Sequence, residues 1–107
     1  MSWASGYIKK LAKGETVEFR PKGNSMKPLI KSGDLVVVEP LSNEYVIEKG
    51  DIVLCKVKGA HYLHLVSAIQ GERLQISNNR GHVNGWISRN AIYGRLTENK
   101  GRASGEL

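Results

Sequence analysis

Short apolar segments separated by turn-forming residues constrain this chain more than any other sequence feature. About seven such segments recur along it, with Gly, Asn or Pro between most of them. The clearest lie at 35–39, 52–57, 61–69 and 73–77. This pattern predicts a mostly β fold with a coiled, antiparallel, barrel-like sheet.

Residues 3–12 have a different period and predict one short N-terminal helix. Their large apolar residues recur at helical spacing: Trp3, Tyr7, Ile8 and Leu11. We expect this stripe to pack on the rest of the chain; a membrane-surface anchor is the alternative, because aromatic residues and lysines suit that role. The β core is predicted over 16–96, which gives a single domain over 1–96. Residues 97–107 lack periodicity and predict a flexible tail.

Positive charge is concentrated in the first third of the chain. The formal net charge is +6, and residues 1–31 carry seven Lys or Arg against two Glu, a net of +5. Such an excess would attract nucleic acid, an anionic surface or an acidic partner. Simple solubility is the alternative explanation of the same charge.

Cys55 is the only cysteine. No intrachain disulfide can form, which predicts a reducing compartment and a cytoplasmic location. The chain has one cysteine and three histidines, and their spacing is not that of a zinc finger or a zincin helix. We therefore expect no metal site and no cofactor. No apolar run approaches the roughly 18 residues of a membrane span, so a soluble protein is expected.

The segment 22–34, Lys-Gly-Asn-Ser-Met-Lys-Pro-Leu-Ile-Lys-Ser-Gly-Asp, carries the first candidate for chemistry. Gly23 can adopt backbone angles closed to other residues, so the chain can turn sharply just before Ser25. Such a turn can present the serine hydroxyl beside main-chain N–H groups, the arrangement that a nucleophile and an oxyanion hole require. An ordinary loop between strands is the alternative.

A nucleophilic serine needs a base within hydrogen-bond reach, and His64 is the expected base. Side chains alternate along the predicted strand 61–69, so Tyr62 and His64 share one face. His64 has a leucine on either side in an otherwise apolar strand, where a polar ring needs a partner. A structural histidine that has found such a partner is the alternative. His61 and His82 are expected at exposed positions.

Three segments resemble the signal peptidase I and LexA-type serine peptidase superfamily. They are Gly23-Asn-Ser-Met-Lys-Pro-Leu-Ile30, Gly33-Asp34 and Lys49-Gly-Asp-Ile-Val53, followed by an apolar return strand. The resemblance covers residues 17–96. It implies a coiled β fold in which a serine in a Ser-Met motif attacks a peptide carbonyl.

The nearest branch is that of the endoplasmic-reticulum and archaeal-type signal peptidases, which use a histidine base. Leu63-His-Leu-Val66 is similar to their Val-His-Arg-Val, and Ile76-Ser-Asn-Asn79 to their Gly-Asp-Asn-Asn. Ala91-Ile-Tyr-Gly-Arg-Leu96 resembles their closing strand. The sequence departs from this branch because none of its apolar runs is long enough for a transmembrane anchor, so an unanchored protein is expected.

The resemblance implies a role for each matching residue. Ser25 would be the nucleophile and His64 the base, and the backbone N–H of Ser25 would serve the oxyanion hole. The loop residues beside the nucleophile are Gly23, Asn24 and Met26. Ser77 replaces the branch's acidic residue, so Ser77 or Asn78 is the expected third member that orients His64. Residues expected to line the substrate groove are Val36, Val38 and Leu63.

These residues are compatible with three functions. The first is a soluble serine endopeptidase whose Ser25–His64 dyad hydrolyses a peptide bond in an extended segment, with a small-residue site as one option. Its activity is expected to rise through about pH 6–7, where histidine loses its proton. The second is a weakly active or inactive module on the same fold that binds a protein partner, which the serine at position 77 favours. The third is a basic β domain that binds nucleic acid, against which the scattered aromatic residues count.

Overall fold

The computed structural model describes residues 2–102. This part of the chain forms one α-helix, seven strands and a short 3₁₀ turn. In chain order the elements are α1 (Ser5–Ala12), β1 (Val17–Phe19), β2 (Val36–Glu39), β3 (Ile52–Val57), β4 (Ala60–Gln70), β5 (Arg73–Ser77), β6 (Val83–Ser88), η1 (Arg89–Ala91) and β7 (Ile92–Asn99). The predicted mostly β fold with one short N-terminal helix is confirmed.

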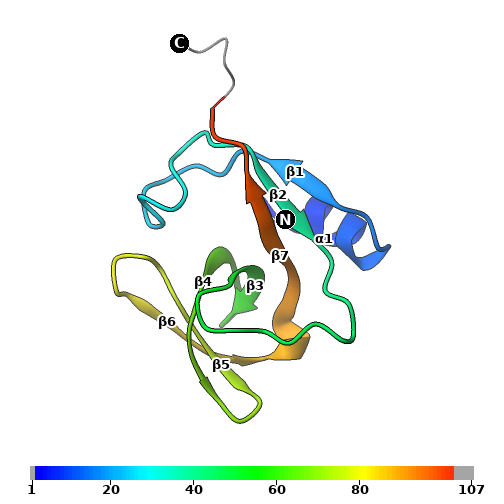
Figure 1. The fold of residues 1–107 in the computed structure, drawn as a ribbon, viewed down its shortest axis with the longest axis vertical. Coiled ribbons are helices and arrows are strands. Elements are labelled where there is room, and N and C mark those ends of the chain that lie inside the picture. Colours follow the sequence, from blue (N-terminus) through cyan, green and yellow to red (C-terminus); the bar gives the residue numbers. More distant parts are fainter. Residues whose placement is uncertain (1, 103–107) are drawn as a thin grey trace.

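All seven strands form one antiparallel sheet in the order β1-β2-β7-β3-β4-β5-β6 (Figure 1). Strands β3 to β6 follow one another as neighbouring hairpins. At the first of these hairpins, Lys58 and Gly59 both have positive φ, 51° and 87°, as a two-residue hairpin turn requires. The sheet does not close into a barrel, because β1 and β6 are its two edges.

Helix α1 packs against β1 and β7, and its Leu11 belongs to the same buried cluster as Val36 and Val38 of β2. Leu11 is buried, and the ring of Tyr7 stacks on Phe19 of β1 with 4.4 Å between centroids. Gly14, at φ 85°, follows the helix, and its N–H donates to the carbonyl of Leu11, a common way for a helix to end. The apolar stripe of the helix therefore packs on the protein, as predicted.

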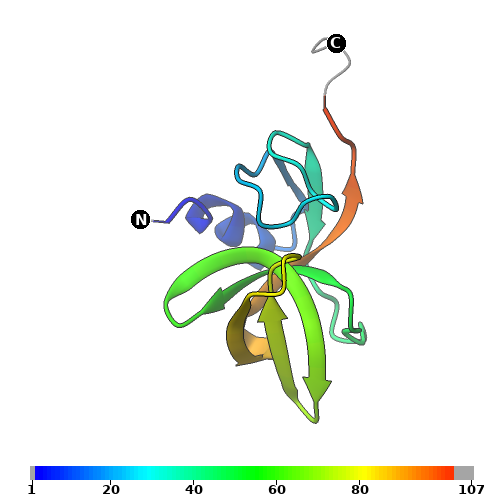
Figure 2. The same ribbon diagram turned by 90° about the vertical axis from the view of Figure 1, so that its left-hand side faces the viewer.

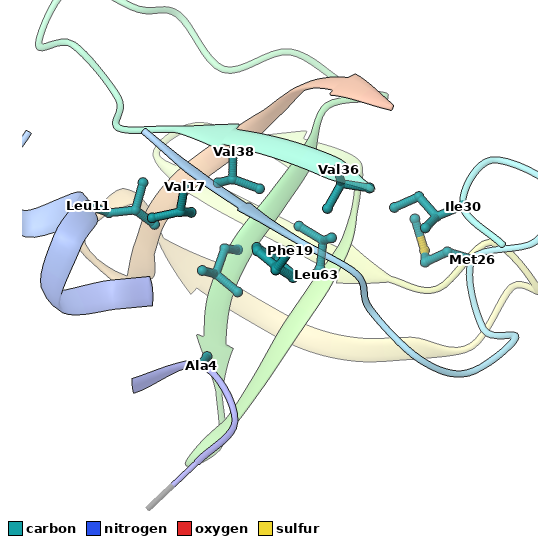
Figure 3. Packing of buried hydrophobic residues seen from close by; sticks show 10 residues of the cluster. Ala4, Leu11, Val17, Phe19, Met26, Ile30, Val36, Val38 and Leu63 are labelled. Atoms are coloured by element: carbon teal, nitrogen blue, oxygen red, sulfur yellow. The ribbon is translucent and has the colours of Figure 1, made fainter. Parts of the chain in front are cut away.

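The buried apolar residues form two clusters. The first joins α1, β1 and β2 to the loop between β1 and β2, which contributes Met26 and Ile30 (Figure 3). These two side chains are only 5% and 4% exposed. The second cluster surrounds β3 and β5, with Val53 and Ile76 fully buried at its centre. Because the loop has two residues in the first cluster, the position of Ser25 is tied to the core.

The C-terminal end of the sheet lies further along the chain than predicted. Strand β7 continues to Asn99 and pairs with β2 there. Beyond it, the Leu35 N–H donates to the Gly101 carbonyl, and the Lys100 N–H donates to the Leu35 carbonyl. Residues 97–101 therefore belong to the sheet and its margin, and the predicted tail from residue 97 is wrong to that extent. Residues 103–107 lie outside the described part of the chain.

Two other boundaries also differ from the prediction. Helix α1 begins at Ser5 rather than Trp3, after the Ala4 N–H has bonded to the Ser2 hydroxyl. The segment 78–85 is rich in turn formers, a composition that by itself predicts a loop, yet it contains the start of β6 at Val83. Pairing with β5 overrides the local preference there.

Candidate active site

The loop between β1 and β2 holds Ser25 at the surface of the sheet. Gly23 has φ 108°, so the chain turns just before the serine in a conformation that favours glycine, as the sequence predicted. The loop then meets the turn between β5 and β6, and Figures 1 and 2 show the two segments side by side. The backbone N–H of Asn79 donates to the Ser25 carbonyl at 2.9 Å, and its side-chain amide donates to the Lys27 carbonyl at 2.8 Å.

Ser25 and His64 are in hydrogen-bond contact. Oγ of Ser25 lies 3.2 Å from Nε2 of His64, although 39 residues separate them in the chain. The other ring nitrogen, Nδ1, lies 2.7 Å from Oδ1 of Asn84. Because an amide oxygen can only accept, Nδ1 carries the proton and Nε2 is left to accept from the serine hydroxyl. This is the tautomer that a general base needs.

Asn84 was not among the predicted site residues, and a β-bulge explains its position. In the β5–β6 pair, Ile76 lies opposite Gly85 and Ser77 lies opposite Val83, so Asn84 is the extra residue of β6. A bulge re-aims the side chain of its extra residue. Asn84 can therefore reach the histidine on β4 even though β5 lies between the two strands.

Ser77 and Asn78, the two residues expected to orient the histidine, have other contacts. Ser77 is buried in β5, paired with Leu65 on one side and Val83 on the other. Oδ1 of Asn78 accepts the backbone N–H groups of Arg80 and His82 and so organises the β5–β6 turn. The hydrogen-bond partner of His64 Nδ1 is therefore Asn84, not either predicted residue.

Burial controls the protonation of His64. The residue is 7% exposed, and desolvation lowers the pKa of its imidazole below the usual 6.5. The hydrogen bond to Asn84 opposes this shift, and nearby His82 adds to it. Tyr62 lies on the same face, as the alternation predicted, with its ring stacked on the imidazole at 4.8 Å. The ring is thus neutral at pH 7 and held between two neighbours.

The loop around the serine leaves two backbone N–H groups unpaired within residues 2–102. In the described part of the chain, the backbone N–H groups of Ser25 and Met26 have no acceptor. The carbonyl of Asn24 accepts the N–H of Lys27, which keeps this stretch in a tight turn. A loop of this kind can direct N–H groups at the oxygen of a bound carbonyl.

The Ser25–His64 pair opens into a cavity of about 800 Å³. Of the predicted groove residues, Leu63 lines this cavity, whereas Val36 and Val38 do not. Both valines are fully buried in the first core cluster, where α1 and the Ser25 loop cover them (Figure 3). The groove prediction is therefore wrong for these two residues.

The remaining histidines have different surroundings. His82 is exposed, as predicted, and lines the cavity. His61 is half-buried rather than exposed, since its Nδ1 lies 2.6 Å from the Ser2 hydroxyl and its ring packs edge-to-face with that of Tyr93.

A curled antiparallel sheet that presents a serine in contact with a histidine is the architecture of a peptidase-fold protein. The chain belongs to the Peptidase S24-like family, whose model matches residues 2–96. This match confirms the resemblance to the LexA and signal peptidase superfamily. A search of curated proteins finds no match to the chain. Within residues 2–102, α1 is too short to cross a membrane, and no other helix could do so.

Proposed function

We propose that the protein is a serine endopeptidase in which Ser25 is the nucleophile and His64 the general base. The observation that carries this proposal is the continuous contact from Ser25 Oγ through the imidazole to Asn84, with distances of 3.2 and 2.7 Å. A nucleophile, a base within hydrogen-bond reach and a group that orients the base are the parts by which this chemistry is recognised. The family assignment supports the same reaction class.

Acylation uses the neutral imidazole. Ser25 Oγ attacks the carbonyl carbon of the substrate while its proton passes to His64 Nε2. The carbonyl oxygen becomes an oxyanion, and the free N–H groups of Ser25 and Met26 are available to stabilise it. When the C–N bond breaks, the imidazolium donates its proton to the leaving amine, and an acyl group remains on Ser25.

Deacylation repeats these steps with water. The water oxygen attacks the acyl carbon while His64 takes a proton from the water. The second tetrahedral intermediate then expels Ser25 Oγ. The serine recovers its proton from Nε2, and a free carboxylic acid leaves. Throughout, the Asn84 oxygen accepts from Nδ1–H and keeps the imidazole in its orientation.

The substrate is an extended peptide segment. Strand β1 is an edge strand, and the chain that continues from it through Lys22 and Gly23 lines the cavity beside Ser25. A free edge offers main-chain donors and acceptors with which an extended peptide can pair. Such pairing would carry the scissile carbonyl to the serine.

The test is digestion of a peptide library, read by mass spectrometry, with the native protein and the variants Ser25→Ala and His64→Ala. Ser88→Ala is the matched control, because this serine is exposed on β6 and lies outside the cavity. We expect cleavage by the native protein and by Ser88→Ala, and none by the other two. Cleavage that survives in Ser25→Ala would exclude the proposed nucleophile.

A binding module without catalysis is the second candidate, and the neutral side chain of Asn84 favours it. A carboxylate beside the histidine would stabilise the imidazolium formed during attack, and an amide does so less well. If the native protein binds peptides but neither cleaves them nor reacts with a fluorophosphonate at Ser25, this candidate replaces the first.

A further inference from the structure

One wall of the cavity is an aromatic cluster built jointly by the N-terminal segment and β1. Trp3, Tyr7 and Phe19 all line the cavity. The Trp3 ring lies 5.8 Å from Phe19 and 6.5 Å from Tyr7, and Tyr7 stacks on Phe19 at 4.4 Å between centroids. Each ring supports the others, so together they offer a preformed apolar surface.

The aromatic wall is continuous with apolar side chains beside the serine. Met26, Ile30 and Leu63 also line the cavity, and each is at most 6% exposed. They belong to the same core cluster as Phe19 (Figure 3). An apolar surface therefore extends from the residue next to Ser25 to the N-terminal segment.

Trp3 stands out because half of it is left in solvent. It is 52% exposed, whereas Phe19 beneath it is 6% exposed. The cavity volume of about 800 Å³ falls within the range typical of sites that enclose a ligand. A large apolar group placed in the cavity would cover the exposed face of the tryptophan and remove it from water.

We propose that this cavity selects peptides with a bulky apolar side chain, above all an aromatic one, next to the scissile bond. The inference rests on the proposed function, because it treats the cavity as the substrate site of the Ser25–His64 pair. A small side chain such as alanine would leave the aromatic wall uncovered and gain little from it. An aromatic side chain would bury its own surface and that of Trp3 together.

The experiment measures binding, so that it does not depend on turnover. Short labelled peptides that differ only at one central residue, Ala, Leu, Phe or Trp, are titrated into the Ser25→Ala protein and followed by fluorescence polarisation. All peptides carry the same charge, because Arg20 and Lys22 also line the cavity and would respond to a charge difference. The series is repeated with Trp3→Ala added.

Trp86→Ala is the matched control. Trp86 is 37% exposed, lies on β6 and does not line the cavity. We expect the Phe and Trp peptides to bind roughly tenfold or more tightly than the Ala peptide. This preference should fall several-fold in Trp3→Ala and be unchanged in Trp86→Ala.

A second measurement guards against a folding defect in Trp3→Ala. In a Ser25→Ala protein that also carries Trp86→Phe, Trp3 is the remaining tryptophan, so its emission reports on the cavity wall directly. The Phe peptide should change this emission, and the Ala peptide at equal concentration should change it far less. Equal affinity for the Ala and Phe peptides, or a Trp3 emission that no peptide alters, would overturn the inference.

The two proposals fail in different ways. Cleavage by the native protein without any preference for bulky side chains leaves the peptidase function standing and removes the specificity. Selective binding of aromatic peptides without cleavage supports the cavity's selectivity and removes the peptidase function.

Discussion

Oδ1 of Asn84 on β6 lies 2.7 Å from Nδ1 of His64 on β4, although β5 lies between these two strands. The contact fixes which ring nitrogen holds the proton and therefore which one faces Ser25. It also supplies an uncharged group where serine peptidases often have an acid. The protein's chemistry can be tested at this one position without changing the shape of the site.

Asn84→Asp replaces the amide by a carboxylate of the same shape. A negative charge beside the imidazole favours its protonated form, so the pKa of His64 should rise by about one pH unit or more. The measurement is an NMR pH titration of the His64 ring. Asn90→Asp, at an exposed position outside the cavity, is the control and should leave the titration unchanged. An unchanged pKa in Asn84→Asp would mean that the contact does not form in solution.

Activity should depend on pH through the neutral form of His64. Burial lowers its pKa below 6.5, so the imidazole stays unprotonated, and able to accept the serine proton, down to that range. The rising limb of kcat/KM should therefore be centred below pH 6.5. Rates measured across the pH range with one cleaved peptide decide this. A limb centred above 6.5 would point to a different base.

Asn79→Ala removes the side-chain hydrogen bond to the Lys27 carbonyl but leaves the backbone bond to Ser25. The Ser25 loop should be less well fixed, and misplacement of a nucleophile is costly in rate. We expect labelling of Ser25 by a fluorophosphonate to slow roughly tenfold, with little change in thermal stability. Asn43→Ala, at an exposed position, is the control. Equal labelling rates in both variants would show that the loop does not need this anchor.

Two glycines should respond to alanine in opposite directions. A Cβ at Gly94 would lie 2.6 Å from the Glu39 carbonyl oxygen and 3.0 Å from Val38, so Gly94→Ala should lower the free energy of unfolding by about 1–3 kcal/mol. Gly6 lies in α1 with nothing within 4 Å of a new Cβ, so Gly6→Ala should raise it by roughly 0.5–1 kcal/mol. Chemical denaturation of both variants measures the two changes. A stable Gly94→Ala protein would contradict the close packing of β7 on β2.

Cys55 should not react in the folded protein. The residue is fully buried in β3, and desolvation raises the pKa of its thiol to about 12, so almost no thiolate forms near neutral pH. Alkylation followed by intact mass should show no adduct until denaturant unfolds the chain. Rapid labelling under native conditions would show that β3 opens. Protection would also allow serine-directed reagents to be used without interference from the thiol.

The parts of the fold that are local in sequence could be predicted. Ile52–Val57 and Arg73–Ser77 form strands with the predicted bounds, because their β-branched and alternating residues agree with their neighbours in the sheet. Ser25 and His64 could be proposed as partners because one follows a glycine turn and the other interrupts an apolar strand. The hydrogen bond between them needed the full sheet.

The wrong or missing site predictions concern residues whose surroundings are set by tertiary packing. Val36, Val37 and Val38 are all buried, so β2 is covered on both faces and alternation cannot tell which face borders a cavity. The aromatic wall joins residues 3–7 to Phe19 through packing that no short-range pattern describes. Asn84 was missed because the turn formers of 78–85 favour a loop, whereas pairing with β5 and a bulge in β6 place this residue beside the histidine.

The bulge at Asn84 also affects how related chains should be aligned. Asn84 contacts the histidine because it lies in a bulge of β6. One inserted or deleted residue in β6 would bring a different side chain to the same place. The number of residues between the histidine and the residue that orients it can therefore differ between related chains. A motif search that requires an acid at a set distance would class this chain as a dyad. Superposition of the β5–β6 hairpins would instead show that an amide, that of Asn84, occupies the position of the acid that orients the histidine in a triad.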